Sequence, residues 1–479
     1  MTIKREPTLL EAFIPVIFLI ILLSINVGIF GDAALDGSNQ IVLILSAAVA
    51  ALVAMRAGFR WNELQDGIVK SISSAMTSLL ILLLIGSLAG TWLLSGIVPA
   101  MIYYGLQILN PKVFLVAAAI VCSIVSLATG SSWTTAATVG IALIGIGKAL
   151  GISEGMIAGA ILSGAYFGDK MSPLSDTTNL APAMAGTDLF THIRHMMVTT
   201  IPSISITLII FLIIGLTGSN AEGTVDTELI LTAISDKFHI SFWLFIVPIV
   251  VVVLIVKKMP AIPALLIGTL LGSVCALIFQ PELVAEIGGS ASGEGLFIGT
   301  MKSLYGSISI STNHEMVNEL LSSGGMSGML GTIWLILSAM IFGGVMESSG
   351  MLKRIAKAII SMVNSTGALI ASTVGTCVFF NVTASDQYLA IVVPGRMYSD
   401  IYKRKNLAPQ NLSRTLEDSG TVTSVLVPWN TCGAYHSTVL GVSTLAFAPY
   451  CFFNIISPLM TIFVGYLGYK ITKINPKED

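Results

Sequence analysis

The stretch 168–179, GDKMSPLSDTTN, concentrates chemically active side chains between two long apolar segments. It contains Asp169, Lys170 and Asp176, with serine, threonine and asparagine side chains around them. Pro173 lies between the two aspartates, and a proline removes a backbone hydrogen bond and breaks a helix. Unwound carbonyls, together with carboxylate, hydroxyl and amide oxygens, form the surroundings that a small cation such as Na⁺ needs. The stretch therefore predicts a broken helix whose oxygens bind a small cation.

Five carboxylates occur in or beside polar breaks of apolar sequence: Asp169, Asp176, Asp386, Glu417 and Asp418. A charge at the centre of a bilayer costs about 2.5–3.5 kcal/mol even on a lenient insertion scale, so a group of them indicates function. An ionised carboxylate binds a cation, and a protonated one carries H⁺. These five residues are therefore the candidates for proton coupling.

Structural roles for the same residues stay open. Asp169 and its neighbour Lys170 could form an ion pair within the membrane. Asp176 could cap a half-helix through its oxygen, which does not exclude cation binding. Glu417 and the aspartate after it follow Arg414, so they also fit the cytoplasmic start of a helix, where acidic residues complement the helix dipole.

Further oxygen-bearing side chains occur at three more breaks: TGSSW (129–133), NVTASDQ (381–387) and LEDSGTVTSVLVPWNTCG (416–433). The last of these contains Pro428, so it resembles the first stretch in having a helix breaker beside hydroxyl and amide groups. The candidate ligands in the second half of the chain are Asn381, Thr383, Ser385, Asp386, Asn430 and Thr431.

The composition shows what kind of molecule must position these residues. Of 479 residues, 54% are apolar and 10% are charged, and the mean hydropathy is +0.88. A soluble protein has roughly 25% charged residues, so the chain is predicted to be an all-α polytopic membrane protein. The net charge of −2 and the lack of a basic patch argue against nucleic acid as a partner. No cysteine or histidine spacing indicates a metal centre, and no cofactor is expected.

Apolar runs long enough to cross a bilayer recur along the whole chain. The candidate spans are 11–30, 40–56, 71–95, 197–217, 240–256, 259–280, 327–348 and 440–469. Three further regions are long, mixed and interrupted: 113–149, 152–186 and 366–438.

The distribution of Lys and Arg orients the spans, because cytoplasmic loops are enriched in both. It places the N- and C-termini inside and the stretches 218–238 and 281–326 outside. KRIAK (353–357) and KRK (403–405) both belong inside, although they bracket the apolar stretch 366–398. A re-entrant hairpin satisfies both clusters, whereas the alternative is one span with an external basic loop.

An offset of 254 residues aligns the two halves without a gap. It pairs Gly90 with Gly344, Ser95 with Ser349 and Gly96 with Gly350. Farther along, it pairs Ser131 with Ser385, Asp176 with Asn430 and Thr177 with Thr431. The span 71–95 is preceded by inside bases and its partner 327–348 is followed by them, so equivalent helices cross in opposite directions. This is the pattern of inverted repeats in secondary transporters.

The predicted architecture has about ten transmembrane helices, two re-entrant hairpins and interrupted helices. Segment 1–39 is an extra N-terminal helix, and 218–258 connects the two repeats. The first repeat, 40–217, contains the hairpin 113–149 and the interrupted helix 152–186. The second repeat, 259–470, contains the hairpin 366–401 and the interrupted helix 412–438. Residues 471–479 form a cytoplasmic tail.

GSSWTTAATVGIAL followed by GAYFGDKMSPLSDTTNLAPAMAGTDLF resembles the NhaC family of bacterial Na⁺/H⁺ antiporters, within the ion-transporter superfamily. The resemblance extends over most of the chain and implies an exchanger with inverted repeats and two re-entrant hairpins. Members exchange Na⁺ for H⁺, and some relatives couple these ions to malate and lactate. The residues inside the matching motif are Ser131, Ser132, Asp169, Ser172, Asp176, Thr177, Thr178 and Asn179.

The resulting hypothesis is a Na⁺/H⁺ antiporter of the bacterial plasma membrane that works by alternating access, with Li⁺ as a further candidate cation. Asp169, Asp176 and the neighbouring hydroxyls would hold Na⁺. The alternative is a Na⁺- or H⁺-coupled exchanger of organic acids, of the malate and lactate type, or of amino acids. A channel fits the carboxylates less well, and no catalytic motif favours an enzyme. The expected partners are the lipid bilayer and a small cation; a small carboxylate and a homodimer stay open.

Overall fold

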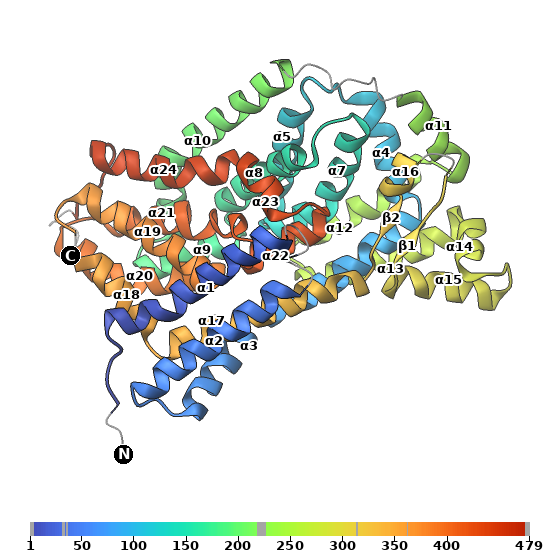
Figure 1. Ribbon diagram of the computed structural model, residues 1–479. Helices are drawn as coiled ribbons and strands as arrows, with labels where there is room; N and C mark the ends of the chain where they lie inside the picture. Colours follow the sequence, from blue (N-terminus) through green and yellow to red (C-terminus); the bar gives the residue numbers. More distant parts are fainter. Residues whose placement is uncertain are drawn as a thin grey trace.

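The computed structural model describes residues 4–30, 34, 37–217, 227–312, 315–361 and 363–474. The predictions for 1–39, for 218–238 and for the tail 471–479 fall partly outside the described residues, at 1–3, 31–33, 35–36, 218–226 and 475–479. The described chain is almost wholly helical, as the composition predicts (Figure 1). One short antiparallel pair interrupts it, in which β1 (Ile308–Ser309) pairs with β2 (Ser322–Ser323).

The described part of the first half of the chain forms ten α-helices and one π-helical turn, η2, before the connecting helices begin. They are α1 (Leu9–Phe30), α2 (Ser38–Arg56), α3 (Trp61–Leu94), α4 (Ile97–Ile108), α5 (Phe114–Thr129), α6 (Ser132–Thr135), η2 (Ala136–Gly140), α7 (Ile141–Ala149), α8 (Glu154–Met171), α9 (Asp176–Ala185) and α10 (Leu189–Thr217). The connecting elements are α11 (Thr227–Lys237), η3 (Phe242–Phe245) and α12 (Ile246–Val256).

The second half has the same alternation of long, short and broken helices. Its first elements are α13 (Ala261–Phe279), α14 (Pro281–Gly288), α15 (Gly293–Tyr305), α16 (Glu315–Leu320), η4 (Ser327–Met329), α17 (Leu330–Ser348) and α18 (Met351–Ser361). The later elements are α19 (Thr366–Thr383), α20 (Gln387–Arg404), α21 (Pro409–Leu416), η5 (Glu417–Thr421), η6 (Ser424–Leu426), α22 (Thr431–Leu440), α23 (Thr444–Phe447), η7 (Ala448–Tyr450) and α24 (Phe452–Leu467).

Seven helical segments of the described chain are long and apolar enough to cross a bilayer, or up to nine if two bent pairs count as spans. They include a helix for every span expected from hydropathy. Two bends lie at expected spans. Segment 242–256 follows α11 at an angle of 87°, and the last span, 440–469, bends by 54° between η7 and α24. Outward faces carry exposed apolar side chains such as Ile213, Ile249 and Ile278, as contact with lipid tails requires.

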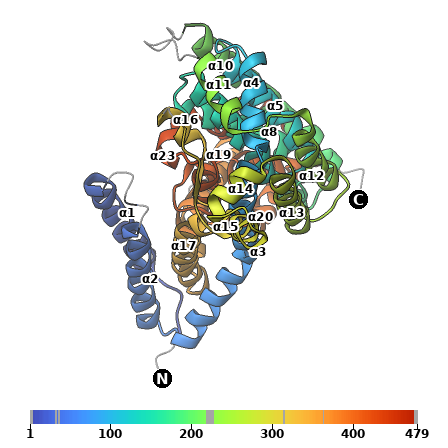
Figure 2. The same ribbon diagram turned by 90° about the vertical axis from the view of Figure 1, so that its right-hand side faces the viewer.

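Helices α2 and α3 both run alongside α17, and α1 packs against α2 at one edge of the molecule (Figure 2). Helices α5 and α8 pack closely because α8 presents glycines to α5. A Cβ atom on Gly164 would lie 2.1 Å from the carbonyl oxygen of Ala119, and one on Gly168 would lie 2.4 Å from that of Ser123. Small residues at such positions let helix backbones approach in membranes. This contact fixes the C-terminal end of α8, which carries the first polar break.

Both predicted hairpins turn at a capped break between two helices. Ser131 accepts a hydrogen bond from the backbone N–H of Thr134 at the start of α6, and Asp386 accepts one from Leu389 at the start of α20. The residue before each cap has a left-handed backbone, with φ of 69° at Gly130 and 59° at Ser385. The arms α19 and α20 pack against each other, as a hairpin requires. Re-entry into a membrane on one side stays a prediction.

The caps at the two hairpin tips, Ser131 and Asp386, are 255 residues apart and not 254. The gapless alignment of the two halves is therefore wrong by one residue from these tips onward. The offset of 254 holds at the ends of α3 and α17, where Gly96 and Gly350 have φ of 82° and 75°. Helices α9 and α22 instead align at 255, residue for residue, and each ends at a left-handed glycine, Gly186 or Gly441. The turn between α19 and α20 is one residue longer than the turn between α5 and α6.

The corrected offset changes the predicted pairs. Ser131 corresponds to Asp386, and Asp176 corresponds to Thr431 rather than to Asn430. Ser175 and Asn430 are then equivalent, and both cap the half-helix that follows the break. The opposite orientation of the two halves in a membrane stays a prediction.

Candidate functional site

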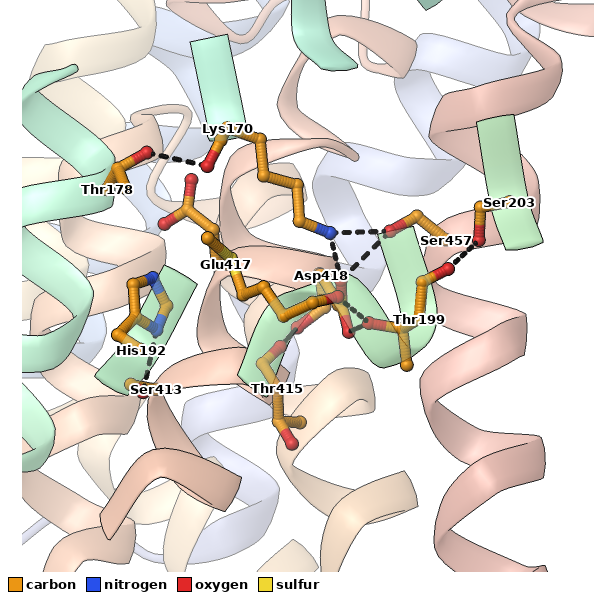
Figure 3. Close-up of polar contacts among 12 residues, drawn as sticks. Lys170, Thr178, His192, Thr199, Ser203, Ser413, Thr415, Glu417, Asp418 and Ser457 are labelled. Atoms are coloured by element: carbon orange, nitrogen blue, oxygen red, sulfur yellow. Dashed lines mark hydrogen bonds and ion pairs between the residues drawn. The ribbon is translucent and has the colours of Figure 1, made fainter. Parts of the chain in front are cut away.

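Buried polar side chains from both halves of the chain meet where α8 ends, close to η5 (Figure 3). Elements α6, α9, α10 and α24 supply the remaining contacts. In both halves the helix is irregular at this point: α8 stops before Pro173, and η5 is a π-helical turn inside the second interrupted helix. A π-turn widens the helix and often marks a functional position.

Asp169 is held by the first hairpin tip. Its Oδ2 accepts hydrogen bonds from the backbone N–H of Ser132 at 3.0 Å and from the Ser132 hydroxyl at 2.6 Å. The Asp169 residue is 7% exposed, and its carboxylate forms no ion pair within the described part of the chain. The predicted pair of Asp169 with its neighbour Lys170 is therefore not formed.

Lys170 pairs instead with Asp418 of η5, and both side chains are fully buried. Ser457 of α24 accepts a hydrogen bond from the Lys170 ammonium at 3.0 Å and donates one to Asp418 Oδ1 at 3.1 Å. Thr199 of α10 donates to Asp418 Oδ2 at 2.8 Å. Figure 3 shows the lysine extending toward this group from the end of α8. The pair connects the first broken helix to the second.

Glu417, the residue before this aspartate, is fully buried and has a different environment. Its Oε1 accepts a hydrogen bond from the Thr177 hydroxyl at 3.0 Å, and its Oε2 has no hydrogen-bond partner among the described residues. It forms no ion pair within the described chain. Glu417 and Asp418 thus do not lie at a solvated helix start, and that alternative is wrong.

The other polar residues of the break hold its shape. The Thr178 hydroxyl donates to the carbonyl oxygens of Asp169 and Lys170, at 3.2 and 3.0 Å. Asn179 donates to the Pro173 carbonyl at 2.9 Å, and Ser172 accepts from the backbone N–H of Leu174. Backbone groups freed by the proline are satisfied in this way.

Asp176 and Asp386 have no hydrogen bond to this buried group among the described residues. Asp176 begins α9 with an exposed side chain, and Asn179 is also exposed. Asp386 is 3% exposed and caps α20. Of the predicted Na⁺ ligands in the first half, the structure therefore buries Asp169 and leaves Asp176 accessible.

The candidates of the second half form their own hydrogen-bonded group. Asn381 donates to the Gly420 carbonyl and the Thr423 hydroxyl at 2.8 and 2.9 Å. Asn430 donates to the Asn381 side-chain oxygen at 3.2 Å, and the Thr431 backbone N–H donates to the Ser385 carbonyl. The Ser385 hydroxyl has no partner in the described chain, and Thr383 donates to the carbonyl one turn earlier. These contacts join the second hairpin tip to the second break.

The structure adds four residues that sequence reasoning did not single out as ligands. Thr199, Ser457, His192 and Arg414 are all buried. Single polar residues inside apolar spans are common, so nothing in the sequence distinguishes Thr199 or Ser457 from others.

Comparison with known proteins places the chain among transporters. The sequence model described as the Na⁺/H⁺ antiporter family matches residues 164–469, which include both breaks and the second hairpin. The chain is also 38% identical over 434 residues to the Na(+)/H(+) antiporter NhaC of Alkalihalophilus pseudofirmus, covering 91% of each protein. The chain belongs to the Na⁺/H⁺ antiporter family. The resemblance found in the sequence is thereby confirmed.

Relatives of this antiporter chain carry several different names. It is 38% identical to the Malate-2H(+)/Na(+)-lactate antiporter of Bacillus subtilis, covering 98% of this chain and 97% of that one. It is 34% identical to the arginine/ornithine antiporter ArcD of Halobacterium salinarum, covering 99% of this chain and 95% of the relative. Family membership therefore establishes a membrane antiporter and leaves its solutes to be argued from the site.

Proposed function

We propose that this protein exchanges Na⁺ for H⁺ across a bacterial plasma membrane by alternating access. One observation carries the proposal: Asp169 and Glu417 are buried carboxylates without an ion-pair partner in the described chain. The buried ammonium of Lys170 is taken by Asp418. The two free carboxylates are surrounded by hydroxyl and N–H donors from Ser132 and Thr177.

A buried carboxylate without a cationic partner is stable only when it binds a cation or a proton, because an isolated charge in a medium of low dielectric is very costly. The same oxygens therefore hold either Na⁺ or H⁺, and loading one displaces the other. If the site changes the side it faces only when Na⁺ or H⁺ is bound, and never with empty carboxylates, the protein exchanges one ion for the other. The two carboxylates come from opposite halves of the chain, so relative movement of the halves changes the site.

The test uses everted membrane vesicles in which respiration has built up a pH gradient. Adding NaCl or LiCl should dissipate the gradient, and KCl serves as the comparison. Glu417→Gln and Asp169→Asn should abolish the response, because neither amide exchanges a proton. Glu282→Gln, at an exposed position of α14, is the matched control and should respond like the wild type. A wild-type protein with no Na⁺- or Li⁺-dependent response would refute the proposal.

Thr177 provides a graded test of the same site. Thr177→Val removes the hydroxyl that donates to Glu417 Oε1, and hydrogen bonds to charged groups contribute about 1.5–3 kcal/mol. The Na⁺ concentration for half-maximal response should rise by about tenfold or more. Thr177→Ser, which keeps the hydroxyl, should behave like the wild type. Equal behaviour of the valine and serine variants would remove Glu417 from the cation site.

A further inference from the structure

Arg414, in the last turn of α21, is a buried cation that the exchange of Na⁺ and H⁺ does not use. The residue is 0% exposed. None of its three guanidinium nitrogens, Nε, Nη1 and Nη2, has a hydrogen-bond partner among the described residues. A guanidinium carries five N–H donors and stays protonated in proteins. Its burial without partners is therefore expensive unless another group completes the site.

The carboxylate of Asp418 cannot complete this site. Asp418 is the carboxylate that acts electrostatically on Arg414. Its Oδ1 already accepts from Lys170 and Ser457, and its Oδ2 accepts from Thr199. Lys170 thus occupies this carboxylate, and the Arg414 guanidinium has no ion-pair partner of its own in the described chain.

Two histidines of α10, close to Arg414, also have ring nitrogens without a hydrogen-bond partner in the described chain. His192 bonds through Nδ1 to the hydroxyl of Ser413, the residue before Arg414, at 2.8 Å, and its Nε2 has no partner in the described chain (Figure 3). His195, one turn farther along α10, also has an Nε2 without a partner. Arg414 acts electrostatically on His195, and α10 packs against α21. Five unsatisfied nitrogens therefore belong to this one helix interface.

We infer that Arg414, His192 and His195 form a binding site for the carboxylate group of a small organic acid. The guanidinium is planar and binds a carboxylate through two parallel hydrogen bonds, which also neutralises the uncompensated charge. The histidine nitrogens supply further donors around the same group. The inference rests on the proposed function, because the acid would be a second solute of the same antiporter, carried beside the Na⁺ and H⁺ site.

The first experiment measures binding by the purified full-length protein in detergent. Apparent Tm is measured at fixed pH and Na⁺ concentration with sodium malate, lactate, chloride, phosphate or methanesulfonate. A ligand at many times its Kd should raise Tm by at least about 2 °C. Malate or lactate should do so, and the other three anions should not. The inference is overturned if no carboxylate stabilises the wild type, or if chloride or phosphate does so equally.

Variants then assign the location. Arg414→Gln should remove the stabilisation by carboxylate, and Arg414→Lys should weaken it, because an ammonium cannot bind in the bidentate manner. Arg194→Gln is the matched control, since Arg194 is exposed on α10 between the two histidines. Unchanged stabilisation in Arg414→Gln would overturn the assignment. If that variant does not fold, His195→Gln decides in its place, with loss or weakening of the stabilisation expected.

Transport separates this inference from the proposed function. Proteoliposomes loaded with malate or lactate should take up the labelled acid by counterflow, and Na⁺-driven proton movement is measured in the same preparation. Proton movement without carboxylate binding or counterflow would overturn the inference and leave the proposed function intact. Counterflow without any Na⁺-dependent proton movement would overturn the proposed function and support the site at Arg414.

Discussion

At the scale of single residues, the polar break in an apolar sequence is enough to predict that Asp169 belongs to the site. Asp169 stands out in the sequence because it lies in a polar break, and the structure buries it against Ser132. The partner of Lys170 could not be found in this way, because Asp418 is 248 residues distant and the adjacent aspartate was the obvious choice. Long-range pairs of this kind depend on the packing of α8, α10 and α24, which no local pattern encodes.

The pair of Lys170 and Asp418 should behave as a coupled unit in stability. Removing one partner of a buried ion pair leaves an uncompensated charge and costs about 3–5 kcal/mol, so Lys170→Met and Asp418→Asn should each lower the apparent Tm strongly. The double variant should lose much less than the sum of the two, because no unpaired charge is left.

Thermal unfolding of the purified variants in detergent measures this coupling. Lys148→Met is the control, because Lys148 forms a partly exposed pair with Glu154 at 2.6 Å and such pairs contribute little. If the double variant lost as much Tm as Lys170→Met and Asp418→Asn together, the two residues would not form a coupled pair.

At the scale of elements, Pro173 and Pro428 predicted two helix breaks, and the structure has a break at each. The lengths of the turns were harder to predict. The extra residue between α19 and α20 moves every later pair by one, so Asp176 and Asn430 are not equivalent. A gapless comparison cannot detect such an insertion when identity is low. The π-turn η5, which places Glu417 and Asp418, also has no signal in hydropathy.

The contact between α5 and α8 should be sensitive to a single methyl group. Gly164→Ala would place a Cβ 2.1 Å from the Ala119 carbonyl oxygen, and this backbone atom cannot move without shifting α5. Overpacking costs about 1–3 kcal/mol, so the variant should have a lower apparent Tm and a smaller monodisperse fraction. Gly375→Ala on α19, where no atom lies within 4 Å of the added Cβ, is the control. Equal stability of both variants would show that the helices are not in close contact.

At the scale of the whole molecule, hydropathy predicted a helix for each expected span, because a bilayer requires long apolar helices. It did not predict the bends of 87° and 54°, because hydropathy measures how apolar a segment is and does not give its direction. The distribution of Lys and Arg predicts which end of each helix faces the cytoplasm, and it places both termini, KRIAK and KRK there. Two contacts agree with it: Lys357 of KRIAK lies 3.2 Å from Glu6 near the N-terminus, and Ile474 near the C-terminus bonds to the Asn406 carbonyl beside KRK.

The predicted orientation places α14 outside the cell and the end of α20 inside, and Figure 1 shows these elements at opposite ends of the molecule. Single cysteines at Glu282 and Lys405, both exposed, test it in a Cys275→Ser background, since the other native cysteines are buried. A membrane-impermeant maleimide should label Glu282→Cys in intact cells and Lys405→Cys only after permeabilisation. Because KRIAK and KRK are both expected inside, Lys353→Cys should follow Lys405→Cys. Labelling of Lys405→Cys but not of Lys353→Cys in intact cells would mean that 366–398 crosses the membrane once, and the hairpin would then be wrong.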